Sequence, residues 1–129
     1  MSEAATHTLL IIDDDELVRE TLSEILQAAG YGVRTAINGE SGLRLFDEQR
    51  PNLVITDILM PVKEGIETIH ELRKRDRDVK VIAISGGGRA ASFLGYLDMA
   101  EKLGANASLA KPFTRDQVLD IVATTLGSD

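Results

Sequence analysis

The chain has 129 residues, of which 43% are hydrophobic, and a net charge of −7 at pH 7. These values fit one globular domain with a sizeable core and argue against a nucleic-acid-binding surface, which would need a basic patch. The absence of cysteine excludes disulfides, thiol catalysis and zinc–thiolate sites. No apolar run approaches the roughly 20 residues that a membrane span needs, and the start lacks a signal peptide, so we expect a cytoplasmic protein.

Five short apolar runs alternate with five amphipathic segments along the chain. The runs predict strands at Thr8–Ile12, Gly32–Ala36, Leu53–Thr56, Val79–Ile84 and Ala107–Ala110. Such alternation predicts a doubly wound α/β fold, with a parallel sheet and helices on both of its faces. No linker or internal repeat divides the chain, so we expect a tail over residues 1–7, one domain over residues 8–127 and no output domain.

Capping residues and apolar spacing indicate where the helices lie. The first should be capped by Asp15 and end near Gly30, and the second should begin after Asn38. A third contains the stripe Ile66, Ile69 and Leu72, and a fourth should run from about Arg89 to Leu103. The last should open with a capping box of Thr114 and Gln117. The predicted inner faces are Val18, Leu22, Ile25 and Ala29 in the first helix, and Val118, Ile121, Val122 and Thr125 in the last.

Groups suited to phosphoryl chemistry follow four of the five predicted strands. Asp57 ends the most apolar strand, strand one is followed by Asp13 and Asp14, strand four by Ser85 and strand five by Lys111. Ligands bind beyond the carboxyl ends of strands in such sheets, and right-handed crossovers place strands one and three side by side. Three converging carboxylates repel one another unless a cation intervenes, and magnesium with phosphate oxygens suits such a site.

Taken singly, each of these residues has a simpler interpretation. By position alone, Asp57 is a nucleophile, a metal ligand or a helix cap. An aspartate after a strand is commonly a helix cap, which is our interpretation of Asp15, and one lysine is commonly a solvated charge. The metal and phosphoryl site is favoured because groups of the required type follow several strands at once.

Four separated motifs resemble those of response regulator receiver domains of the CheY-like class. They are Ile11-Ile12-Asp13-Asp14, Asp57-Ile58-Leu59-Met60-Pro61 with Gly65, Ile84-Ser85-Gly86, and Lys111-Pro112-Phe113. The resemblance extends from about Leu9 to Leu126. It implies a flavodoxin- or CheY-like five-stranded sheet in the order 2-1-3-4-5, with five helices, in a stand-alone signalling protein.

The resemblance also implies a phosphoacceptor and a metal site. Asp57 would take a phosphoryl group from a phosphohistidine on a sensor histidine kinase or a histidine phosphotransfer protein. Asp14 and Asp57 would bind Mg²⁺, or Mn²⁺ in its place, directly. Asp13 would bind it through water, and the backbone carbonyl of Leu59 would be a further ligand.

Two more residues would bind the phosphoryl group by the same resemblance. These are the hydroxyl of Ser85 and the ammonium of Lys111, whose peptide bond to Pro112 would be cis. Before transfer, three aspartates balance a divalent cation and a lysine, whereas the acyl phosphate leaves one negative charge in excess. That charge would draw Ser85 inward, and Gly86 and Gly87 leave the backbone free to follow. An unidentified downstream protein would then bind the face of helix four, strand five and helix five of a monomer.

Three features depart from the family pattern. Ser108 stands where many relatives carry Tyr, Phe or His, so we do not expect an aromatic rotamer switch there. The segment Gly86–Met99 is longer than in CheY, which predicts a partner surface of its own. Leu59 and Gly87 lie where the family tunes hydrolysis of the acyl phosphate. We hypothesise that apolar Leu59 slows this hydrolysis, so that Leu59→Asn would shorten the half-life of phosphate release.

Two functions from other classes stay open at this point. A phosphatase of the haloacid-dehalogenase type carries an Asp-x-Asp pair after strand one, which Asp13 and Asp15 mimic. Against it, position 17 is Leu rather than Thr or Val, and we expect no cap domain; turnover of p-nitrophenyl phosphate would decide. The other alternative is a binding module that never uses phosphate.

Overall fold

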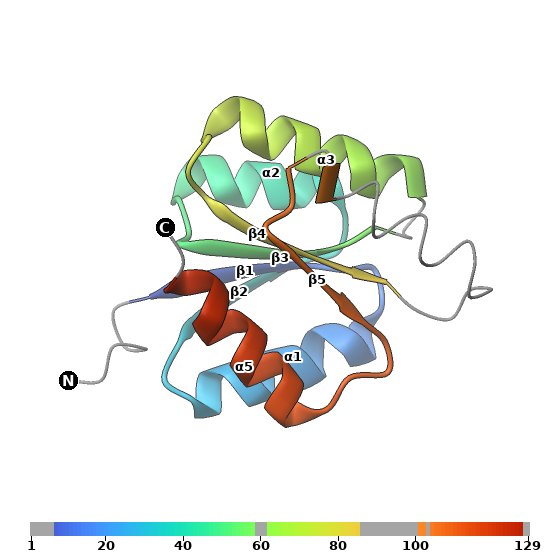
Figure 1. Cartoon of the computed structure of the whole chain (residues 1–129). Helices are drawn as coiled ribbons and strands as arrows, with labels where there is room; N and C mark the ends of the chain where they lie inside the picture. Colours follow the sequence, from blue (N-terminus) through green and yellow to red (C-terminus); the bar gives the residue numbers. More distant parts are fainter. Residues whose placement is uncertain (1–6, 59–61, 86–100, 103, 128–129) are drawn as a thin grey trace.

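A five-stranded parallel sheet in the order β2-β1-β3-β4-β5 forms the centre of the molecule, with helices on both faces (Figure 1). This computed structural model describes residues 7–58, 62–85, 101–102 and 104–127, without the side chains of residues 62–64 and 85. The strands are β1 (Thr8–Ile12), β2 (Gly32–Ala36), β3 (Leu53–Asp57), β4 (Lys80–Ser85) and β5 (Ala107–Ala110). The helices are α1 (Glu16–Ala28), α2 (Gly39–Glu48), α3 (Val62–Arg75) and α5 (Arg115–Leu126).

The predicted fold class and strand order are confirmed. Two strands differ from the prediction by one residue at their ends, because β3 extends through Asp57 and β4 covers Lys80–Ser85 rather than Val79–Ile84. The predicted helix from Arg89 to Leu103 falls mostly outside the described residues, of which Glu101 and Lys102 are helical. No helix in the described part of the chain is long and apolar enough to cross a bilayer.

Alternation along the strands divides the core into two layers. Leu10, Ile12 and Val54 pack with Phe46 and Ile69 of α2 and α3 on one side of the sheet. Their neighbours Leu9, Ile11 and Ile55 point the opposite way, toward α1 and α5. All five residues of β3 are buried, as expected for a central strand covered on both faces. The sheet is therefore a rigid platform for the residues that follow its strands.

The predicted helix caps are confirmed. The Asp15 carboxylate accepts from the backbone N–H groups of Leu17 and Val18, and Thr114 forms the capping box with Gln117. Asn38 also forms a capping box, with Ser41, which we had not predicted. This pair was missed because a capping box is usually recognised by Glu or Gln, not Ser, at the third helical position.

The inner face of α1 differs from the prediction at two positions. Leu22 is buried as predicted, and Val18 and Ile25 are half-buried and pack against the same core. Leu26 is also buried, although it was not predicted, whereas Ala29 is half-buried and lies just past the helix end. The chain turns there because Gly30 adopts a φ of 102°, which ends the helix before Ala29 can join its buried stripe. In α5 the predicted Val118, Val122 and Thr125 are buried and Ile121 is half-buried.

Candidate functional site

Parallel strand pairing brings the acidic residues together at the carboxyl edge of the sheet. Ile12 of β1 is in register with Thr56 of β3, so the next residues along the two strands, Asp13 and Asp57, lie side by side. Asp14 follows directly, and one carboxylate oxygen from each of the three aspartates lies within 4.8 Å of the others. The sequence-based prediction of a converging acidic trio therefore holds in the geometry.

The two neighbouring aspartates of the β1–α1 loop differ sharply in environment. Asp13 is fully buried, whereas Asp14 is exposed. The Asp13 backbone N–H donates to the carbonyl of Ala36 at 3.1 Å, and its Oδ1 accepts from the N–H of Asp15 at 2.9 Å. Its own carbonyl accepts from the guanidinium of Arg19 at 2.8 Å. Asp13 is thus held rigidly, while the Asp14 carboxylate faces the open side of the site.

Lys111 supplies the cation of the site. Its ammonium lies 3.1 Å from Oδ2 of Asp57 and 3.4 Å from Oδ2 of Asp13. The residue directly follows β5, and its peptide bond to Pro112 is cis, as the resemblance implied. One ammonium thereby bridges the two buried carboxylates from a distant part of the chain.

Burial and charge shift the pKa values of two of these groups. Burial raises the pKa of Asp13 to about 6, and the nearby Asp57 adds to this, while the Asp15 N–H and Lys111 oppose it. Burial alone would lower the pKa of Lys111, but the carboxylates of Asp57 and Asp13 outweigh it, and the pKa is raised. Lys111 therefore stays protonated, while Asp13 is costly to ionise at neutral pH without further positive charge.

This donor set fits a hard divalent cation. Three carboxylates within 4.8 Å of one another offer only oxygen ligands, and one lysine does not balance their charge. Asp14 is exposed, which leaves the cluster open to solvent and to a further ligand. Asp13, Asp14 and Asp57 are the residues that could hold a metal ion here.

Other predicted site residues lie apart from the cluster or outside the description. Ser85 ends β4, with its side chain undescribed, and Leu59, Gly86 and Gly87 lie outside the described residues. Ser108 belongs to β5, where its hydroxyl donates to Oε2 of Glu101 at 2.6 Å. This contact was not predicted, because nothing in the local pattern indicates which side chain Ser108 would meet.

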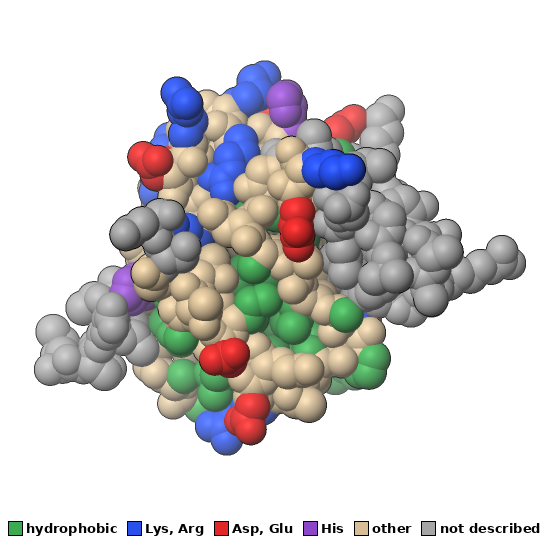
Figure 2. All heavy atoms as spheres, viewed as in Figure 1, with side chains coloured by type: hydrophobic (Ala, Val, Ile, Leu, Met, Phe, Trp, Pro, Cys, Tyr) green, Lys and Arg blue, Asp and Glu red, His purple; other side chains and the backbone are tan. Residues whose placement is uncertain are grey.

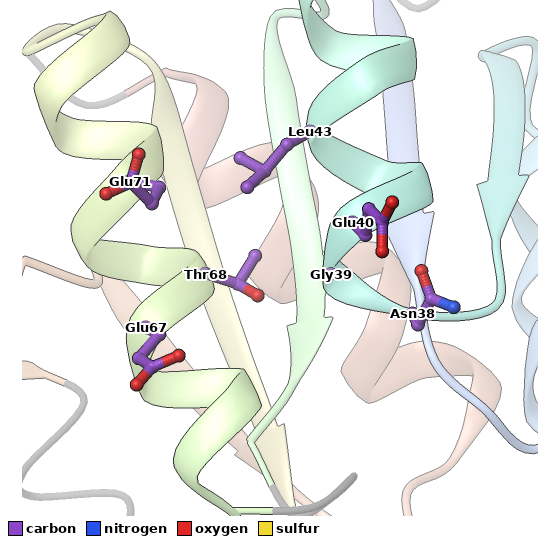
Figure 3. A pocket seen from close by; sticks show the side chains of 7 residues that line it. All are labelled: Asn38, Gly39, Glu40, Leu43, Glu67, Thr68 and Glu71. Carbon is purple, nitrogen blue, oxygen red and sulfur yellow. The ribbon is translucent and has the colours of Figure 1, made fainter.

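The hollow between α2 and α3 is separate from the acidic cluster. A cavity of about 450 Å³ lies between α2 and α3 and is lined by Asn38, Gly39, Glu40, Leu43, Glu67, Thr68 and Glu71 (Figure 3). None of the three aspartates lines it. A smaller hollow of about 210 Å³ lies beside Lys111 and is lined by Leu17, Val18, Thr21, Lys111, Pro112 and Phe113. This smaller hollow adjoins the site through Lys111.

Comparison with known proteins finds one family. The model of the response regulator receiver domain matches residues 9–123. The chain is 31% identical to the chemotaxis protein CheY of Halobacterium salinarum, over 92% of this chain and 95% of that protein. It is 32% identical to sporulation initiation phosphotransferase F of Bacillus subtilis, over 88% of this chain and 89% of that protein.

Solved structures agree with these relatives. The receiver domain of NtrX from Brucella abortus superposes with a TM-score of 0.85 at 28% identity, covering 94% of this chain and 99% of that one. Some further relatives are longer proteins, of which this chain spans less than half: 40% of one and 48% of another. The match is therefore to the receiver unit common to all of them.

Proposed function

Because the chain belongs to the response regulator receiver domain family, we propose that it is a phosphoacceptor switch in which Asp57 takes a phosphoryl group from a phosphohistidine. The observation that carries the proposal is the meeting of Asp13, Asp14 and Asp57 with the ammonium of Lys111 at one sheet edge. The donor would be a sensor histidine kinase or a histidine phosphotransfer protein. Such a donor has to reach this edge, where Leu17 exposes an apolar side chain.

In the proposed transfer, a carboxylate oxygen of Asp57 attacks the phosphorus atom as the P–N bond to the donor imidazole breaks. The electron pair of that bond stays on the imidazole nitrogen, and the product on Asp57 is an acyl phosphate. Lys111 lies 3.1 Å from Oδ2 of Asp57, so its ammonium is placed to pair with the oxygens of the incoming group. The buried wall around Asp13 and Asp57 strengthens these charge interactions by excluding water.

Mg²⁺, or Mn²⁺ in its place, would be held by Asp14 and Asp57 directly and by Asp13 through water, with the carbonyl of Leu59 as a further ligand. A metal ion so bound would polarise the phosphoryl group and offset the charge of the aspartates. Since burial raises the pKa of Asp13 to about 6, a cation at this place would also favour its ionised form.

The signal would leave through the β5–α5 side of the molecule. Phosphorylation adds one negative charge beside Lys111, which would draw the hydroxyl of Ser85 inward while Gly86 and Gly87 allow the backbone to follow. Hydrophobic side chains gather in the middle of the face seen in Figure 2, over β5 and α5, whose partly buried residues include Leu109 and Leu119. We propose that a monomer of this protein acts in the cytoplasm by binding a downstream protein there.

The test is incubation with Mg²⁺ and acetyl phosphate, followed by intact mass measurement. The expected result is one added phosphoryl group on the wild type and none on Asp57→Asn. Omission of Mg²⁺ should also prevent labelling. An Asp57→Asn variant that is labelled as fully as wild type would overturn the assignment of the phosphoacceptor.

The structure weakens the haloacid-dehalogenase alternative. That mechanism needs a second free acid at Asp15, but this carboxylate accepts from the N–H groups of Leu17 and Val18 and caps α1. Sustained turnover of p-nitrophenyl phosphate would nevertheless reverse this conclusion. A phosphate-independent binding module would instead show no acetyl-phosphate labelling at all.

A further inference from the structure

Arg19 makes one specific contact that the proposed chemistry does not use. Its guanidinium donates to the backbone carbonyl of Asp13 at 2.8 Å, six residues back along the chain. Glu16 and Glu20 line the same surface hollow as Arg19, yet neither forms an ion pair with it in the described structure. The guanidinium therefore bonds a peptide group of the β1–α1 loop rather than either of these carboxylates.

The peptide group that Arg19 holds is the one joining Asp13 to Asp14. Orientation of this planar group places the N and Cα atoms of Asp14, from which its side chain leaves the backbone. The Asp13 carboxylate is fixed by hydrogen bonds from the Asp15 N–H and from the ammonium of Lys111. Within the described part of the chain, the Asp14 carboxylate has no hydrogen bond or ion pair. The position of the Asp14 carboxylate therefore depends on the backbone of the β1–α1 loop.

From this geometry we propose that Arg19 is a positioning residue, which aims the Asp14 carboxylate at the divalent cation of the acidic cluster. The inference rests on the proposed function, since it assumes a metal ion held by Asp13, Asp14 and Asp57. Partners behind metal ligands orient those ligands, and their loss commonly weakens metal affinity about 10- to 100-fold. Arg19 acts through the peptide group and does not touch the metal.

A positioning role and a purely electrostatic role predict opposite signs. If Arg19 acted only as a positive charge near the cluster, its removal would tighten cation binding, because repulsion would be relieved. If it aims Asp14, its removal weakens binding despite the relieved repulsion. Arg19→Gln removes the charge and the guanidinium fork, so the direction of the change in Mg²⁺ affinity separates the two roles.

The experiment is titration of the full chain with Mg²⁺ by calorimetry, beside urea denaturation of each variant in EDTA. We expect Arg19→Gln to weaken Mg²⁺ binding about tenfold, at the lower end of the usual range. Arg19→Lys should weaken it less, because an ammonium can donate to the carbonyl but lacks the rigid fork. Should the Gln variant not fold, the Lys variant alone decides, and its wild-type affinity would contradict the proposal.

Arg34 provides a matched control. It is also half-buried, and its guanidinium donates to the backbone carbonyls of Leu45 and Gln49, away from the acidic cluster. Arg34→Gln should lower stability without changing Mg²⁺ affinity, as a merely structural arginine would. Unchanged or tighter Mg²⁺ binding in Arg19→Gln overturns the inference while leaving the phosphoacceptor proposal intact. A wild type that binds no Mg²⁺ overturns both.

Discussion

The ammonium of Lys111 lies 3.1 Å from Oδ2 of Asp57, although 54 residues separate the two in the chain. Both side chains are largely buried, with 22% and 7% of their surfaces exposed, and the same ammonium also bonds Asp13. Removal of one partner from a buried pair leaves an uncompensated charge, which costs more than the pair itself contributes. Lys111 therefore stabilises the metal-free protein as well as serving the proposed chemistry.

We predict that Lys111→Met lowers the free energy of unfolding in EDTA by about 1–3 kcal/mol, since Asp13 and Asp57 lose their shared cation. Saturating Mg²⁺ should restore much of this loss, because a second cation takes over the same task. Urea denaturation with and without Mg²⁺ measures both effects. Lys74→Met is the control, because Lys74 pairs with Glu71 on the exposed surface and should cost less than about 1 kcal/mol. An equal loss with Mg²⁺ present would contradict the prediction.

The raised pKa of Asp13 predicts a pH-dependent stability. Its pKa is about 6 in the folded protein against 3.8 for the free side chain, mainly because of burial. The folded state therefore favours the protonated form of Asp13. The contribution of this protonated carboxyl to the free energy of unfolding is fully present below about pH 4 and is lost as pH rises through about 6. Asn cannot ionise, so Asp13→Asn should avoid this loss of stability at higher pH. We expect the variant to be more stable than the wild type in metal-free form at pH 7, by about 1–3 kcal/mol.

Urea denaturation in EDTA at several pH values tests this. The gain from Asp13→Asn should shrink toward zero near pH 4, where the wild-type carboxyl is protonated as well. The companion Asp57→Asn variant shows whether the effect belongs to Asp13 itself. A gain that is the same at pH 4 and pH 7 would show that titration of Asp13 is not its cause.

Local signals explain which parts of this fold were predictable. Asp15 and the Thr114–Gln117 pair follow capping rules that act within four residues, and strand ends depend on short apolar runs. The convergence of Asp13 with Asp57 followed from the rule that parallel crossovers are right-handed. These features needed no knowledge of side-chain packing.

Contacts across the fold could not be predicted in this way. Asp13 and Asp14 are identical in type and adjacent, yet one is buried and the other exposed, which depends on how α1 leaves the sheet. The bond from Arg19 to the Asp13 carbonyl has no sequence signature, because a surface arginine on a helix ordinarily reaches for a carboxylate. The sequence offers only an indirect hint of this bond. Arg19 lies six positions after Asp13, near the start of a helix whose dipole disfavours a positive charge there.

Gly65 of α3 packs directly against the backbone that follows Asp57. A Cβ at this position would lie 2.8 Å from the Asp57 carbonyl oxygen and would also collide with the Cα of Ile58. Alanine favours a helix over glycine by about 1 kcal/mol, but overpacking against backbone costs about 1–3 kcal/mol and should win. We predict that Gly65→Ala destabilises the protein and slows labelling of Asp57 by acetyl phosphate, because the phosphoacceptor loop is displaced.

Urea denaturation and the labelling rate measure the two effects of this change. Gly127→Ala is the control, because the nearest atom to its Cβ would be the Ala123 carbonyl oxygen at 3.4 Å. Gly127 has a φ of −81°, which alanine adopts without strain. Wild-type stability in Gly65→Ala would show that α3 can move away from Asp57 at little cost.

The hydrogen bond from Ser108 to Glu101 ties β5 to the helical residues that precede it. At 2.6 Å and with a carboxylate acceptor, it should stabilise the protein by about 0.5–1.5 kcal/mol even though it is exposed. A double-mutant cycle with Ser108→Ala, Glu101→Ala and the combined variant isolates this coupling in urea denaturation. We expect each single change to cost stability and the second change to add little to the first. Fully additive losses would show that the Ser108–Glu101 hydrogen bond does not contribute to stability. In that case β5 would be held by its pairing with β4 alone, in which Ala83 is in register with Ser108.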